Sequence, residues 1–120
     1  MTEVYRNLPS SNRDFNPLPK DYPVNPWTSF KSKDSNMGKT FKEALISLEC
    51  KVEKGDRDQL VVEFEDLLFE VSMFESKGVS KDFIIEIQRL EGDGYKFFDL
   101  YRNLLLRIQK HQPCVVNLQN

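Results

Sequence analysis

The prolines and glycines of this 120-residue chain are segregated, and this limits what each part can fold into. Five of the six prolines and no glycine lie in residues 1–36, whereas all five glycines lie between Gly38 and Gly94. Four prolines fall within residues 17–26, and each fixes φ and removes a backbone donor, which excludes a helix there. The sequence therefore predicts an extended arm followed by segments that glycines separate.

The proline-rich segment also carries the aromatic side chains of Tyr22, Trp27 and Phe30. Disordered linkers are usually poor in aromatic residues. A backbone stiffened by proline loses less entropy when it docks, and tyrosine and tryptophan are frequent anchors of protein interfaces. We expect residues 1–36 to form an extended docking arm that lays its rings into an apolar groove.

After the arm, apolar residues recur at the spacing of amphipathic helices. Short connections between such segments imply antiparallel neighbours. We therefore predict an all-α fold, a small antiparallel four-helix bundle over residues 37–112 followed by a tail at 113–120. The predicted helices span about 40–54, 57–77, 80–91 and 95–111.

Capping signals agree with this interpretation. Thr40 and Glu43 have the spacing of a capping box, and Gly55 follows the first predicted helix as a stop signal. Gly78 and Ser80 separate the second predicted helix from the third, and Pro113 closes the fourth. The tail is expected to be a frayed end or a short strand that pairs with a neighbour.

The second predicted helix has apolar residues on two sides. Val62, Phe69 and Met73 align opposite its main stripe, and Leu106 lies off the main face of the fourth helix. A small monomeric bundle normally shows one apolar face per helix. We expect this second seam to be covered by the arm in cis, by a second copy of the chain, or by a different protein.

The leading functional hypothesis is therefore a non-enzymatic protein–protein interaction subunit, an adaptor or assembly component of a larger complex or homo-oligomer. Its predicted contact residues are Tyr22, Trp27, Phe30, Val62, Phe69, Met73 and Leu106. An inhibitor or regulator of a cellular machine is an alternative that the residues do not distinguish from this one.

A second alternative comes from charge. The net charge of −2 provides no overall attraction for nucleic acid or for an anionic membrane. The fourth predicted helix nevertheless places Lys96, Arg107 and Lys110 on one face. Such a basic strip suits a phosphate backbone, so the chain is alternatively a small helical subunit of a nucleoprotein complex.

No catalytic, metal or cofactor signature is found. Cys50 and Cys114 have His111 as their sole candidate base, and the sequence NMGKT has Lys33 where a phosphate-binding loop needs glycine. We expect no enzyme activity, metal, cofactor or small-molecule substrate. The apolar runs are too short for a membrane span, and the N-terminal residues lack a signal peptide, which predicts a cytoplasmic or nuclear protein.

Overall fold

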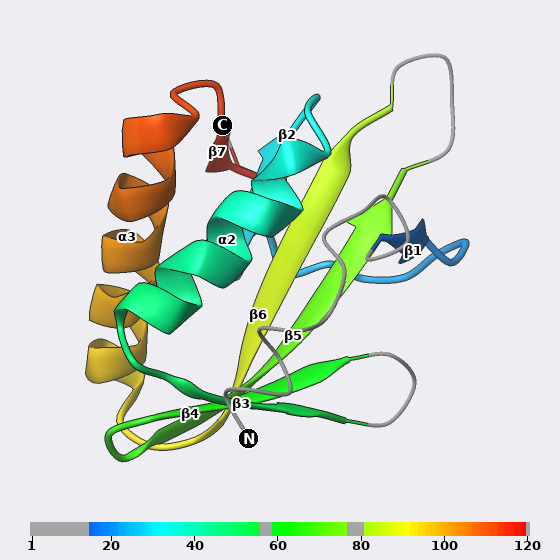
Figure 1. Cartoon of the computed structure of the whole chain (residues 1–120). Helices are drawn as coiled ribbons and strands as arrows, with labels where there is room; N and C mark the ends of the chain where they lie inside the picture. The colour runs from blue at the N-terminus through cyan, green and yellow to red at the C-terminus, as the bar shows by residue number, and fades with distance from the viewer. Residues whose placement is uncertain (1–14, 56–58, 77–80, 120) are drawn as a thin grey trace.

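The computed structural model describes residues 15–55, 59–76 and 81–119. The main element of this part is a seven-stranded sheet, and two α-helices lie on one side of it (Figure 1). The helices are α2 (Asn36–Ser47) and α3 (Gly94–His111), and a 3-10 turn, η2, spans Pro26–Thr28. The strands are β1 (Asn16–Pro17), β2 (Ser29–Ser32), β3 (Lys51–Lys54), β4 (Leu60–Phe64), β5 (Leu67–Glu75), β6 (Phe83–Glu91) and β7 (Val116–Asn117).

The sheet has the strand order β3-β4-β5-β6-β2-β7, and all neighbours in this order are antiparallel. β1 pairs in parallel with the end of β5 and lies off this path. β2 therefore occupies an interior position, and the C-terminal tail contributes β7 at its side. The predicted all-α four-helix bundle is wrong, because the described chain is mostly a sheet with helices on one face.

The predicted helix at 57–77 is the β4–β5 hairpin. Buried and less buried residues alternate along β4 and the first half of β5, as a strand with one face on the core requires. The apolar spacing that predicted a helix arose because apolar residues from both faces of the hairpin were taken together. The inward-facing residues include Leu60, Val62, Leu67, Phe69, Val71 and Met73, and all of them are buried. Gly78 and Ser80, which were the predicted boundary signals, lie outside the described residues.

Two further helix predictions are corrected. The segment 80–91 is strand β6 in its described part, and 40–54 is divided between the end of α2 and β3. Glu49 has a φ of 59°, in the left-handed region, so the chain reverses between α2 and β3 without a glycine. The cap also differs, because α2 begins at Asn36 and the Thr40 hydroxyl donates to the Asn36 carbonyl within the helix.

The fourth predicted helix corresponds to α3. The carboxylate of Asp93 caps it by accepting hydrogen bonds from the backbone amides of Tyr95 and Lys96. The helix ends at His111, two residues before Pro113. Its buried residues recur at helical spacing and are Phe97, Leu100, Tyr101, Leu104 and Ile108.

The described part of the predicted arm is built into the sheet. Between β1 and β2 the chain crosses the side of the sheet away from the helices (Figure 1). There the ring of Tyr22 lies 4.8 Å from that of Phe74, and its hydroxyl donates to the buried carboxylate of Glu86 at 2.8 Å. The backbone amide of Asn25 donates to the same carboxylate at 2.7 Å. The arm thus covers one end of the outer sheet face.

On the inner face, Phe30 of β2 joins both helices to the sheet. Its fully buried ring stacks on Tyr101 of α3 at 4.6 Å and lies 5.7 Å from Phe41 of α2. The Tyr101 hydroxyl donates to the carbonyl of Ser29 at 2.7 Å. These contacts fix which side of α3 faces the core, and therefore which side faces outward.

Candidate interaction surfaces

The outward side of α3 carries large apolar residues in line. Tyr95, Phe98 and Leu106 are 86%, 48% and 62% exposed, and Arg102 lies between Phe98 and Leu106. Spacings of three, four and four residues place all four side chains on one side of a helix. We call Tyr95, Phe98, Arg102 and Leu106 the α3 stripe. Its backbone is held in place by the buried contacts of Phe97 and Tyr101 on the opposite side.

An exposed ion pair lies in the middle of the α3 stripe. Arg102 donates to the carboxylate of Asp99 at 2.8 Å, and the two side chains are 73% and 71% exposed. A pair so open to water contributes little to folding stability. Both charges therefore remain accessible to a partner that approaches this side of α3.

A separate groove of about 420 Å³ lies between α2 and α3. Arg107 is held at its wall, because its Nε donates to Asn103 at 3.0 Å and its Nη1 to the hydroxyl of Ser47 at 3.3 Å. Lys110 and His111 line the same groove. The carboxylate of Glu43 and the hydroxyl of Thr40 also line it, so the groove has mixed charge and can take a polar group.

The structure separates the three residues of the predicted basic strip. Arg107 and Lys110 line one groove near the C-terminal end of α3. Lys96 lies in the first turn of the helix, where its ammonium is 3.3 Å from the carboxylate of Asp66 in the β4–β5 turn. The two parts of the strip are about 16 Å apart along the helix.

The predicted protein-contact residues fall into two groups. Phe30, Val62, Phe69 and Met73 are core residues, and Tyr22 is half-buried against the outer sheet face. Trp27 and Leu106 remain outside, each 62% exposed. Trp27 belongs to η2, whose backbone is fixed because Asn25 caps it and Asn117 donates to the Trp27 carbonyl.

Sequence reasoning missed Tyr95 and Phe98. Phe97 and Phe98 are adjacent, so only one of the two rings can face the core, and in the structure it is Phe97. The detectable signal was the spacing of Tyr95, Phe98 and Leu106, which falls on one side of the helix once Phe97 and Tyr101 are assigned to the other.

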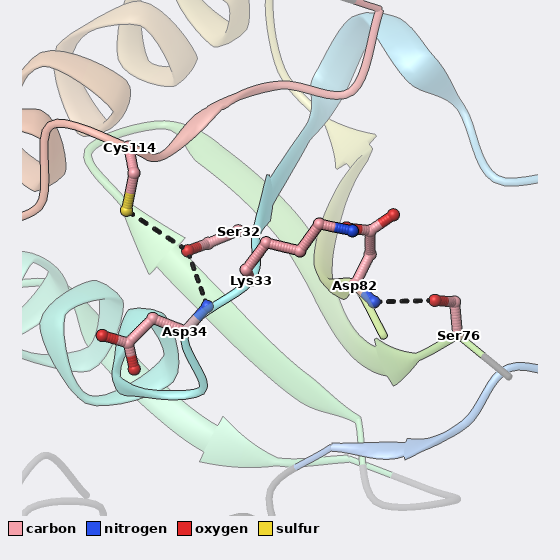
Figure 2. A network of polar contacts seen from close by, with 6 residues as sticks. All are labelled: Ser32, Lys33, Asp34, Ser76, Asp82 and Cys114. Carbon is pink, nitrogen blue, oxygen red and sulfur yellow. Dashed lines mark hydrogen bonds and ion pairs between the residues drawn. The ribbon is translucent and has the colours of Figure 1, made fainter. Parts of the chain in front are cut away.

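A polar cluster fixes the ends of β2, β5 and β6 and the C-terminal tail (Figure 2). The Ser32 hydroxyl accepts from the backbone amide of Asp34 at 3.0 Å and lies 3.7 Å from the sulfur of Cys114. The Lys33 ammonium pairs with Asp82 at 2.7 Å, and the Asp82 amide donates to Ser76 at 2.8 Å. These contacts connect four segments, which is a structural role.

The second cysteine, Cys50, lies in the core. Burial raises the pKa of the Cys50 thiol to about 11, so the thiol stays protonated at neutral pH and is a poor nucleophile. Within the described ranges, no group of three or more histidine, cysteine, aspartate or glutamate side chains is placed to hold a metal ion.

These observations define the class of the protein by fold alone, as a seven-stranded, largely antiparallel sheet with two helices on one face. No protein-family model matches the chain, and a search of curated proteins finds no match. No helix in the part of the chain that the structure describes is long and apolar enough to span a membrane.

Proposed function

We propose that this protein is a non-enzymatic interaction protein that binds another protein through the α3 stripe. The observation that carries the proposal is the exposure of Tyr95, Phe98 and Leu106 on one side of a helix whose other side is fixed in the core. Covering one large apolar side chain is worth on the order of 2 kcal/mol. Three such residues in line therefore offer a concentrated apolar contribution to association.

The composition of the stripe supports the same conclusion. Aromatic residues and arginine are enriched among the residues that dominate binding energy at protein interfaces. The stripe combines the rings of Tyr95 and Phe98 with the guanidinium of Arg102. A helix lying against a partner presents such side chains at spacings of three and four residues.

The test is affinity capture of the full-length protein from its own cells. We expect the variant Tyr95→Ser/Phe98→Ser/Leu106→Ser to lose the protein that the wild type retains. Leu90→Ser is the matched control, because Leu90 is a 47% exposed apolar residue of β6 outside the stripe. Equal retention by the triple variant and the wild type, with both folded by circular dichroism, would refute the proposal.

A second candidate function follows from the groove between α2 and α3. Arg107, Lys110 and His111 at one wall give it the donors that a phosphate group needs, which favours a subunit of a nucleoprotein complex.

In low salt we expect Arg107→Glu/Lys110→Glu to lower nucleic-acid affinity by about tenfold or more, since each reversal removes a phosphate contact. Lys96→Glu, at the other end of α3, is the control. An equal loss in the control, or no binding by the wild type, excludes this function.

An inhibitor or regulator of a cellular machine remains an alternative prediction. It would use the same α3 stripe, and the identity of the captured protein would distinguish it from an assembly component.

A further inference from the structure

We infer that the partner of the α3 stripe is a second copy of this chain, bound by antiparallel packing of α3 against α3. The inference rests on the proposed function, because it names the partner of the surface proposed there. The argument depends on the order of residues along the stripe, on its charges and on the position of α3 at the border of the molecule.

Two pairs of residues on this side of α3, Tyr95 with Leu106 and Asp99 with Arg102, are symmetric about a point between Leu100 and Tyr101. At about 1.5 Å per residue, Tyr95 and Leu106 each lie about 8 Å from this point, and Asp99 and Arg102 each lie about 2 Å from it. A two-fold axis through the point turns the helix end for end. Tyr95 then lies opposite Leu106 of the second copy, and Asp99 opposite Arg102 of the second copy, each pair occurring twice.

Charge complementarity selects this arrangement. In the antiparallel pair, each Arg102 meets the Asp99 of the other copy in addition to its own, so two guanidinium groups and two carboxylates form one neutral network. In a parallel pair, Arg102 would face Arg102 and Asp99 would face Asp99, which is repulsive. The ion pair is exposed in the single chain, so it is free to rearrange in this way.

The apolar residues agree with the same axis. Phe98 and half-buried Leu105 are seven residues apart and lie on one flank of the stripe. The two-fold axis places this flank against the same flank of the second copy. Phe98 then packs against Leu105 and the aliphatic part of Arg102 of the second copy. An aromatic ring beside a guanidinium adds a favourable cation–π contact.

The molecule leaves room for this packing. Figure 1 shows α3 at one border of the molecule, beside α2. The groove between the two helices is lined on α3 by Arg107, Lys110 and His111, which are not part of the stripe, so a second helix can approach the stripe without meeting α2. One pair of such helices buries less than the ~1,600 Å² of a standard interface. We therefore expect a weak dimer, with a dissociation constant of about 1–100 µM.

Sedimentation equilibrium of the full-length chain tests the inference. The wild type should change from monomer to dimer over about 1 µM to 500 µM. Asp99→Arg and Arg102→Glu should each weaken dimerisation by about tenfold or more, because each puts four like charges at the centre of the interface. The double variant Asp99→Arg/Arg102→Glu restores opposite charges and should recover the wild-type constant to within about threefold.

The outcomes separate the inference from the proposed function. A wild type that stays monomeric at the highest concentration overturns the dimer, and so does a double variant as weak as the singles. If the wild type is monomeric and Tyr95→Ser/Phe98→Ser/Leu106→Ser still loses a captured protein, the proposed function stands and the inference fails. If a dimer forms and this triple variant retains it, the α3 stripe is not its interface, and the inference fails as well.

Discussion

At the scale of single residues, Glu86 explains where the arm lies. Its carboxylate is buried on the outer sheet face, where an unpaired charge would be costly. The Tyr22 hydroxyl and the Asn25 amide supply its donors, at 2.8 Å and 2.7 Å. Both donors belong to the arm, so satisfying this one carboxylate requires that the arm cross the sheet.

The first prediction concerns the Tyr22 hydroxyl. Tyr22→Phe keeps the ring on Phe74 but removes one of the donors to Glu86, so we expect a loss of about 1–2 kcal/mol in the free energy of unfolding. Urea denaturation at pH 7 measures it. Tyr95→Phe is the control, because Tyr95 is almost fully exposed and should change stability by less than about 0.5 kcal/mol. Equal stability of the two variants would contradict the role of this hydrogen bond.

The second prediction concerns pH. Burial, followed by the hydrogen bond to Glu86 and nearby carboxylate charge, raises the pKa of Tyr22 from 10.0 to about 12. The folded state therefore holds this proton more tightly than the unfolded state does. The stability it contributes is fully present below pH 10 and is lost as the pH rises from 10 towards 12.

Tyr22→Phe should accordingly show a shallower loss of stability than the wild type between about pH 10 and pH 12 in urea denaturation. Some decline should remain, because burial also raises the pKa of Tyr101. A variant whose stability falls as steeply as that of the wild type would show that Tyr22 is not the titrating group.

At the scale of elements, the junction between β6 and α3 sets where the α3 stripe begins. Gly92 has a φ of 109°, which side chains with a Cβ rarely adopt. A Cβ at this position would lie 2.6 Å from Leu67 Cδ2 and 2.8 Å from the carbonyl oxygen of Asp66. The strand can therefore turn into the helix here only because the residue is glycine.

The third prediction follows from this geometry. Gly92→Ala should lower the free energy of unfolding by about 2–3 kcal/mol, from the strained φ and the contact with backbone. Gly94→Ala is a matched control two residues later, where the nearest atom is Arg89 Nε at 3.9 Å and the residue lies in α3. We expect the control to be neutral or slightly stabilising. Thermal melting of the two variants gives the comparison, and a drop of the same size in both would contradict it.

The elements differed in how well the sequence predicted them. α3 was predictable because Asp93, a long regular apolar period and Pro113 all point to the same helix. The β4–β5 hairpin was not, since its turn contains Glu65 with a φ of 54° in place of the usual glycine or asparagine. Outward-facing Phe74 and Ile84 are also apolar because the arm covers that end of the sheet, and this obscured the period of two.

At the scale of the whole molecule, the arm and the sheet form one structure in the described residues. β2 pairs with β6 on one side and with β7 on the other, so strands from both ends of the chain meet there. No local pattern could have predicted these pairings, because their partners are more than fifty residues apart in the sequence. Segregated prolines correctly excluded an α-helix at 17–26, although a 3-10 turn begins at Pro26, and they did not show that Ser29–Ser32 form a strand.

The fourth prediction compares two aromatic residues of the predicted arm. Phe30→Ala should destabilise the fold by about 3–5 kcal/mol, because its ring is fully buried between Phe41 and Tyr101. Trp27→Ala should cost less than about 1 kcal/mol, since the Trp27 ring is mostly exposed. Urea denaturation of the two variants makes the comparison. Similar losses would contradict the integration of β2 into the sheet.

The α3 stripe was predictable only in part, because the exposure of its residues also depends on contacts with a distant strand. The sequence indicated that apolar residues exceed what a bundle of predicted helices needs, and Leu106 was among those named. Whether a given residue is exposed depends on which side of α3 meets the sheet, and Phe30 and Ser29 of a distant strand decide that. Tyr95 and Phe98 could be assigned outward only after those contacts were known.

The central claim is that α3 pairs with α3 of a second copy in antiparallel orientation, and disulfide cross-linking tests it most directly. In a Cys114→Ser background, chains carrying Tyr95→Cys are mixed with chains carrying Leu106→Cys and oxidised. The account predicts a covalent dimer in the mixture and little in either chain alone, because like positions lie about 16 Å apart, beyond the ~7 Å that a disulfide spans between Cα atoms. Equal cross-linking in the separate chains, or none in the mixture, would contradict it.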